Sequence, residues 1–357
     1  MALPSSAGAT VLVTGAAGFI GSHVVSELLA SGYEVVGLDD LSGGFRENLD
    51  PRATFVEGSI LDVALVERLC AEHRFGYVFH LAAYAAEGLS HFVRRFNYQN
   101  NLIGSVNLIN AAVRYEVRAF VFTSSIAVYG SAPPPVTEET RGSPEDPYGI
   151  AKAAVELDLR SAGEMFGLPF IVFRPHNVYG ERQNIADRYR NVVAIFMSQI
   201  LRGEPLGIFG DGTQTRAFSH ISDIAPIIAA SIRRSAAYGQ TFNIGGDHPC
   251  SINELAETVS RAMGVPHRVR HLASRVEVRH IYASHDKARA LLGYRSRVAL
   301  EDGVRAMAAW VRASGPRERG RVAALEIEKN LPDFWRDQVA SPDRPAQSDS
   351  ASVTRSR

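Results

Sequence analysis

Apolar residues in the first half of the chain form short uninterrupted runs, separated by segments in which they recur every three or four positions. Continuous runs are typical of strands covered on both faces, and the longer period is typical of helices packed on one face. The alternation predicts an α/β fold built on a doubly wound parallel sheet. Strands are expected at 11–14, 33–38, 54–57, 77–81, 119–123 and 169–174, with helices such as 19–30 and 63–72 between them.

After about residue 178 the strand–helix rhythm loosens, which predicts a smaller C-terminal α/β domain. Ser251 and Glu254 have the spacing of a capping box and predict a helix running to about Met263. Further helices are expected at 286–292 and 300–313. We expect a first domain at 1–178 with a contribution from about 212–245, a second at 179–336, and a disordered tail at 337–357, which is rich in Ser, Pro, Asp and Arg.

The length and charge of the chain limit its classes of partner. A chain of 357 residues exceeds what one hydrophobic core usually serves, which agrees with two domains. Lys+Arg and Asp+Glu both number 38, so net charge gives no reason to expect nucleic acid or an anionic membrane as partner. The sequence has no secretory signal, no membrane-spanning run and no metal-ligand spacing. We therefore expect a cytoplasmic protein without a metal.

A Gly-rich turn follows the first expected strand and opens the first expected helix. Gly15, Gly18 and Gly21 have the spacing G-x-x-G-x-x-G within TGAAGFIG. Such a turn allows the backbone to approach a pyrophosphate, and the helix N-terminus offers free N–H groups and a positive dipole end. In the first βα unit of the chain, this turn predicts a dinucleotide site of the Rossmann type.

The second expected strand ends in Leu38–Asp39–Asp40, the distance downstream at which an acid holds the adenosine ribose hydroxyls. A carboxylate at Asp39 repels a 2′-phosphate. The sequence therefore predicts NAD as the cofactor in preference to NADP.

Two further segments supply candidate catalytic groups. Ser125 lies in TSSIAVYG after the fifth expected strand, and Tyr148 and Lys152 lie in PYGIAK. A Tyr and a Lys four residues apart share one helix face. We expect the ammonium, together with the cationic nicotinamide, to lower the phenol pKa from about 10, so that Tyr148 acts as a general base.

With these motifs the sequence resembles the extended short-chain dehydrogenases that modify nucleotide sugars, and it is most similar to their UDP-glucose and UDP-hexuronate 4-epimerase branch. The resemblance covers roughly residues 9–335 and includes HLAA, RPHNVYG, GDGTQTR and NIGG. It implies a UDP-sugar substrate and a homodimer paired through the helices near Asn100 and Tyr148. It implies NAD contacts at Gly15, Gly18, Phe19, Ile20, Gly21, Asp39, Ser59, Ile60, Leu81, Ala82, Ala83, Asn100, Tyr148, Lys152 and His176.

The same resemblance implies substrate contacts at Ser125, Asn177, Asn191, Val192 and Arg216. The segment Ser274–His280 matches the family pattern only in its second half, so either Arg275 or Arg279 is the candidate for the diphosphate.

The reaction is expected to be epimerisation at C4. Related 4,6-dehydratases carry an Asp–Glu pair directly before Val-Tyr-Gly, and related decarboxylases carry a Glu there. This chain has Ile126 and Ala127, which cannot move a proton. A 4-keto sugar must then take its hydride back on the other face. A non-catalytic NAD-binding regulator is the contrasting class, and the intact Ser125, Tyr148 and Lys152 argue against it.

The substrate pair rests on two arginines. Arg188 and Arg190 lie just before Asn191, beside the expected sugar site, and Arg binds carboxylates bidentately. UDP-glucuronate and UDP-galacturonate are therefore the leading pair, and UDP-glucose and UDP-galactose the alternative. Solvent exposure, or pairing with Asp187 and Glu181, is the competing account of both arginines.

Overall fold

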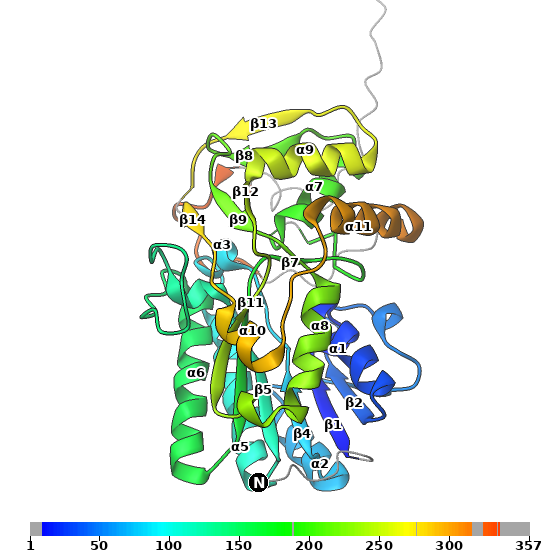
Figure 1. Ribbon diagram of the computed structural model, residues 1–357, viewed down its shortest axis with the longest axis vertical. Coiled ribbons are helices and arrows are strands. Elements are labelled where there is room, and N and C mark those ends of the chain that lie inside the picture. Colours follow the sequence, from blue (N-terminus) through cyan, green and yellow to red (C-terminus); the bar gives the residue numbers. More distant parts are fainter. Residues whose placement is uncertain (1–8, 188, 276, 316–323, 334, 336–357) are drawn as a thin grey trace, which may run out of the picture.

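The computed structural model describes residues 9–187, 189–275, 277–315, 324–333 and 335. A large α/β lobe forms the lower part of Figure 1, and a smaller lobe lies above it. The expected tail at 337–357 and the candidate Arg188 lie outside the described residues.

Seven strands of the described chain form one parallel sheet, in the order β11-β6-β5-β4-β1-β2-β3. This confirms the doubly wound fold, because the strand order reverses at β1, between β2 and β4. All six expected strands are present, with ends that differ by one residue at most. They and the seventh strand are β1 (Thr10–Thr14), β2 (Glu34–Asp39), β3 (Thr54–Glu57), β4 (Tyr77–His80), β5 (Ala119–Thr123), β6 (Phe170–Pro175) and β11 (Gln240–Ile244).

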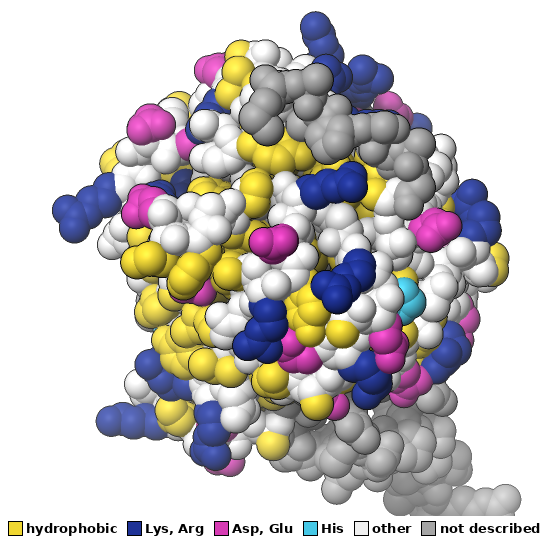
Figure 2. All heavy atoms as spheres, turned by 90° about the horizontal axis from the view of Figure 1, so that it is seen from below, with side chains coloured by type: hydrophobic (Ala, Val, Ile, Leu, Met, Phe, Trp, Pro, Cys, Tyr) yellow, Lys and Arg dark blue, Asp and Glu magenta, His cyan; other side chains and the backbone are white. Residues whose placement is uncertain are grey.

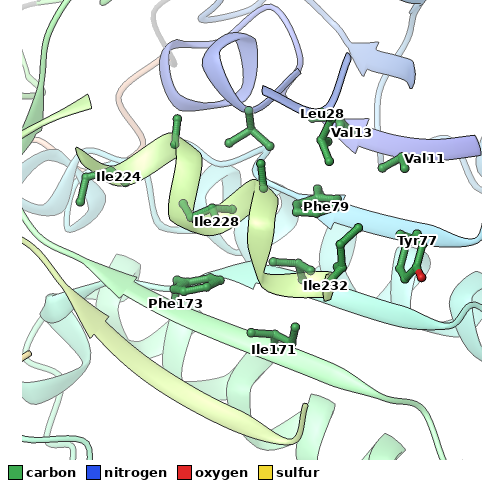
Figure 3. Close-up of a cluster of buried hydrophobic side chains, with 14 of the residues drawn as sticks. Val11, Val13, Leu28, Tyr77, Phe79, Ile171, Phe173, Ile224, Ile228 and Ile232 are labelled. Atoms are coloured by element: carbon green, nitrogen blue, oxygen red, sulfur yellow. The ribbon is translucent and has the colours of Figure 1, made fainter. Parts of the chain in front are cut away.

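Helices cover both faces of the sheet because alternate strand residues point to opposite sides. Val11 and Val13 pack with α1 (Phe19–Ala30) and α8 (Ile221–Ala230) in one buried cluster, and Figure 3 shows Ile224 and Ile228 lying over the sheet. Leu12, on the other side, packs in a second cluster. The helices of that side are α2 (Val63–His73), α5 (Gly104–Arg114) and α6 (Pro147–Phe166).

Helix α6 carries Tyr148 and Lys152, and its start is determined by local chemistry. The Asp146 carboxylate accepts a hydrogen bond from the Gly149 N–H at 2.9 Å, and Pro147 occupies the first turn. Both features satisfy or remove N–H groups that a helix start leaves unpaired. Left-handed Gly167 ends the helix. Tyr148 is thereby held in the first turn, next to the end of β5.

The smaller lobe contains its own buried cluster and short strand pairs. The capping box of Ser251 and Glu254 is present at the start of α9, as expected. The elements of this part of the chain are β7 (Val178–Tyr179), α7 (Val192–Leu201), β8 (Leu206–Phe209), β9 (Thr215–Ala217), β10 (Ser219–His220), β12 (Pro249–Ser251), α9 (Ile252–Met263), β13 (Val269–Leu272), β14 (His280–Ile281), α10 (Asp286–Leu292) and α11 (Leu300–Ser314).

Short helical turns connect the larger elements. They are η1 (Arg46–Asn48), α3 (Glu87–Ser90), α4 (Arg94–Tyr98), η2 (Gln99–Ile103), η3 (Ile126–Tyr129), η4 (Ser231–Arg233) and η5 (Ser235–Ala237). No helix in the described ranges combines the length and apolar character needed to span a bilayer.

The chain passes between the two lobes several times. Strand β11 and helix α8 belong to the large lobe although they follow residue 178. Ala288 and Leu292 of α10 also join its core, and Leu331 and Trp335 pack beside α3 and α4. Helix α10 and the segment of Leu331 and Trp335 both fall in the range 179–336, which the sequence assigned to the second domain. The division into two domains itself stays a prediction.

Candidate active site

A cavity of about 520 Å³ lies between the two lobes, at the carboxyl ends of the parallel strands. Doubly wound sheets bind ligands in this position, because adjacent connections run in opposite directions there and leave a crevice. Residues from both lobes line it, from the Gly15–Gly21 turn to Trp335.

The Gly-rich turn has the shape that a pyrophosphate site needs. Gly15 has φ +70°, and a Cβ at Gly21 would lie 1.9 Å from the Gly15 carbonyl oxygen, so no other residue allows this turn. Gly18 is the N-cap of α1, and no side chain caps the helix. The open N-terminus therefore faces the cavity with its N–H groups available to an anion.

Asp39 ends β2 at the cavity wall and is 8 % exposed. Its carboxylate accepts hydrogen bonds from the backbone N–H of Ala17 at 3.0 Å and of Leu41 at 2.8 Å, while burial raises its pKa. Each carboxylate oxygen can accept a further donor such as a ribose hydroxyl. The turn and this acid together fit an NAD molecule.

The other residues expected at NAD lie in the cavity wall, with one exception. Ser59, Ile60, Leu81, Ala82, Ala83, Asn100, Phe19 and Ile20 all line it. His176 is instead buried behind the wall, where its ring stacks on His285 with 2.9 Å between their Nε2 atoms. Its neighbours Pro175 and Asn177 line the cavity. The His176 side chain therefore points into the protein, and contact of this residue with NAD stays a prediction.

Ser125, Tyr148 and Lys152 come together on one wall, each less than 7 % exposed. The Ser125 hydroxyl lies beside the Tyr148 phenol and acts to lower its pKa. The Lys152 ammonium donates to the Thr123 carbonyl at 2.7 Å and lies 5.8 Å from the centre of the Tyr148 ring. The segment that follows β5 and the start of helix α6 thus supply one cluster.

The protein alone does not produce the expected low phenol pKa. Burial raises the pKa of Tyr148, the negative charge of Glu87 adds to the increase, and the hydrogen bond from Ser125 opposes it. Burial also lowers the pKa of Lys152 to about 7. A phenol of ordinary or lowered pKa therefore needs a further positive charge beside Tyr148, which the nicotinamide ring of NAD would supply when bound.

The structure separates the two arginine candidates for the diphosphate. Arg275 lines the cavity, stacks on Phe209 and Trp335 at 4.4 and 5.8 Å from the ring centres, and pairs with Glu277 at 2.9 Å. Arg279 is outside the wall, with a side chain 67 % exposed. Position alone therefore favours Arg275.

The other substrate candidates line the cavity, but several use their polar atoms within the protein. Asn191 caps α7 by accepting from the Val193 N–H at 2.9 Å and donates to the Val178 carbonyl at 2.8 Å. Arg216 donates to the carbonyls of Thr215 and Arg279, both at 2.9 Å. Their polar atoms therefore hold the wall in shape. Asn177 and Val192 also line the cavity.

Arg190 reaches the cavity with its charge already compensated. Its Nε lies 2.7 Å from an Asp187 carboxylate oxygen, and its guanidinium lies 4.9 Å from the centre of the Tyr84 ring. The pairing with Asp187 is the competing account considered for this residue. A substrate carboxylate would have to share the guanidinium with Asp187.

Residues 11–245 match the model of the NAD dependent epimerase/dehydratase family. The chain belongs to this family. It is 38% identical over 303 residues to UDP-glucose 4-epimerase of Mycolicibacterium smegmatis, covering 82% of this chain and 95% of the relative.

Two solved members of the family are similar in structure. UDP-glucose 4-epimerase of Thermotoga maritima, solved with UDP-glucose, has a TM-score of 0.81 and 36% identity over 85% of this chain and 99% of its own. UDP-glucuronic acid 4-epimerase of Bacillus cereus, solved with its substrate and NAD, has a TM-score of 0.79 and 30% identity, covering 86% and 100%.

The sequence reasoning did not assign several residues of the cavity wall to the site, among them Glu87 and Trp335. Trp335 packs edge-on against Phe92 and Tyr189, and its apolar neighbour Leu331 in a polar stretch was an available signal. Glu87 lies outside every recognised motif. Its presence also weakens the argument that the sugar site lacks an acid, because that argument considered only Ile126 and Ala127.

Proposed function

We propose that this protein is a UDP-sugar 4-epimerase that uses NAD as a recycled cofactor. The observation that carries the proposal is the cluster of Ser125, Tyr148 and Lys152 in the wall of a cavity that also contains a pyrophosphate-binding turn. Membership of the NAD dependent epimerase/dehydratase family, and relatives named UDP-glucose 4-epimerase, support it.

In the proposed reaction Tyr148 takes the proton of the sugar C4 hydroxyl and later returns it. Ser125, whose hydroxyl lies beside the phenol, holds the C4 oxygen in line for that transfer. Lys152 holds positive charge near the phenol. Bound NAD supplies the hydride acceptor at its nicotinamide ring. The C4 oxygen must reach Tyr148 in both half-reactions, while the hydride returns to the face of C4 opposite to the one it left, so the 4-keto sugar turns over within the cavity between the two.

UDP-glucose and UDP-galactose are the substrate pair that we put first, which reverses the order expected from the sequence. The guanidinium of Arg190 is paired with Asp187, and the cavity wall beside Tyr148 contains the carboxyls of Glu87 and Asp146. A C6 carboxylate would be repelled by such surroundings. UDP-glucuronate and UDP-galacturonate stay the second pair, favoured by the position of Arg190 at the cavity.

The test is to incubate the purified protein with UDP-glucose, UDP-galactose, UDP-glucuronate and UDP-galacturonate, and to follow C4 configuration by NMR. We expect the two C4 epimers of a substrate pair to interconvert with no net consumption of NAD. Release of a 4-keto-6-deoxy sugar or of carbon dioxide would assign a dehydratase or a decarboxylase instead. Absence of turnover, with NAD bound and never reduced, would leave a regulatory NAD-binding protein.

We also infer a homodimer paired through α6. Ile150 and Leu157 are seven residues apart on one side of this helix and are 40 % and 61 % exposed. Figure 2 shows hydrophobic side chains gathered on the flank where Figure 1 draws α6. Light scattering should give twice the chain mass, and Leu157→Asp should give a monomer. A monomeric wild type would contradict the inference.

A further inference from the structure

Glu87 lies in the cavity wall beside the catalytic cluster. It is the first residue of the short helix α3, which packs against the start of α6. The Ser90 hydroxyl joins the two helices: it donates to the Glu87 carbonyl at 2.6 Å and accepts from the Tyr148 N–H at 3.3 Å. This connection fixes the backbone of Glu87 relative to that of the proton-transferring tyrosine.

The carboxylate of Glu87 has no hydrogen bond or ion pair with any other residue of the described ranges, although charged groups surround it. Its neighbours use their polar atoms elsewhere. Asp146 caps α6, Arg216 donates to backbone carbonyls, and Arg275 pairs with Glu277. Glu87 therefore presents two acceptor oxygens to the cavity that the fold itself does not employ.

A sugar ring matches this acceptor. The hydroxyls of a hexopyranose donate hydrogen bonds, and bonds to a charged acceptor are about twice as strong as neutral ones. A second carboxylate, such as C6 of a hexuronate, offers no donor when ionised and is repelled. We propose that the Glu87 carboxylate binds hydroxyls of the substrate's sugar ring and selects neutral hexoses over hexuronates. The proposal rests on the UDP-sugar 4-epimerase function.

The titration of Glu87 gives the proposal a pH signature. Glu87 is exposed to the cavity, and the protein walls around it, reinforced by the neighbouring charge of Asp146, raise the pKa of its carboxyl to about 7. The positive charges of Arg216 and Arg275 lower the pKa of Glu87, and the negative charge of Glu277 raises it. Tyr148 is a further titratable neighbour of Glu87. The carboxylate that accepts hydroxyl bonds forms above this pKa. The KM for UDP-glucose should therefore fall as pH rises through 7.

The experiment compares wild type, Glu87→Gln, Glu87→Asp and the control Glu72→Gln between pH 6 and 8.5. Glu72 is a residue of α2 whose side chain is 57 % exposed and pairs with Arg68. We expect Glu87→Gln to raise the KM for UDP-glucose ten- to a hundredfold, the scale of one or two charged hydrogen bonds, with a smaller change in kcat. The KM of Glu87→Gln for UDP-glucose should no longer depend on pH near 7. Its kcat/KM for UDP-glucuronate should rise relative to its kcat/KM for UDP-glucose. Glu87→Asp should keep the pH dependence.

Equilibrium binding separates this proposal from the function on which it rests. UDP-glucose is titrated into each variant by calorimetry, and NAD affinity reports whether the variant is folded. Equal affinity of wild type and Glu87→Gln for UDP-glucose would overturn the role of Glu87. Failure of UDP-glucose and the other UDP-sugars to bind wild type would overturn the proposed function. A 4-keto-6-deoxy product whose formation is lost in Glu87→Gln would make Glu87 an acid–base group instead and refute both.

Discussion

Replacing the buried Lys152 with Met should make the cofactor-stripped protein more stable while it abolishes turnover. The side chain is 2 % exposed and packs 4.6 Å from the centre of the Phe122 ring. Burial lowers the pKa of its ammonium from the ordinary value of 10.5 to about 7. The folded protein therefore holds this proton less strongly than the unfolded chain does, which costs stability.

The size of the effect follows from the pKa. The difference between 10.5 and about 7 corresponds to about 5 kcal/mol for the fully charged group, at about 1.4 kcal/mol per unit. Methionine also leaves the Thr123 carbonyl without the ammonium that donates to it, at a cost of about 1–3 kcal/mol. The net gain at pH 7 should be about 2 kcal/mol, or a few degrees in melting temperature.

The pH dependence gives the more specific test. Between pH 7 and 10.5 the unfolded Lys152 binds more protons than the folded one, so this residue makes wild-type stability increase with pH. The stability cost of the buried Lys152 ammonium is complete below pH 7, and at pH 9 it is smaller by about 2 kcal/mol. The stability advantage of Lys152→Met should shrink accordingly when melting temperatures are measured at pH 7, 8 and 9.

The control is Lys329→Met, the same substitution at an exposed lysine. It should follow the wild type at every pH. If the melting temperatures of Lys152→Met and wild type differ by the same amount at pH 7, 8 and 9, burial does not destabilise the ammonium and the reasoning is wrong.

Three further substitutions test the cofactor site, the base and the sugar specificity. Asp39→Ala removes a ribose acceptor, so NAD affinity measured by calorimetry should fall roughly tenfold or more and its advantage over NADP should narrow; equal wild-type affinities for the two would contradict the role of Asp39. Tyr148→Phe should lower kcat by about 10²–10⁴, with UDP-sugar affinity within a few-fold, and normal turnover would exclude the phenol as base. Arg190→Ala should leave the uronate-to-hexose ratio of kcat/KM unchanged because Asp187 already pairs with the guanidinium. A roughly hundredfold loss confined to UDP-glucuronate would restore the uronate pair.

The fold and the cofactor site could be predicted from the sequence because their signals are local. A strand covered on both faces must be continuously apolar, and the tight turn at Gly15 and Gly21 tolerates only glycine, so both are visible in neighbouring residues. Helix α6 likewise begins where Asp146 and Pro147 require it. The face shared by Tyr148 and Lys152 follows from their spacing along that helix.

The environment of each side chain depended on the tertiary structure, because burial and charge pairing come from segments distant in sequence. The motif containing His176 gave no sign that His285, more than a hundred residues later, would hold its ring away from the cavity. The unpaired carboxylate of Glu87 could not be predicted either, since it depends on where Asp146, Arg216 and Arg275 direct their own polar atoms. The sequence by itself therefore determined the sheet, the Gly-rich turn and the candidate catalytic groups. Only the tertiary structure decided the pKa values and the charges at the cavity, because desolvation and Coulomb interactions act through space and not along the chain.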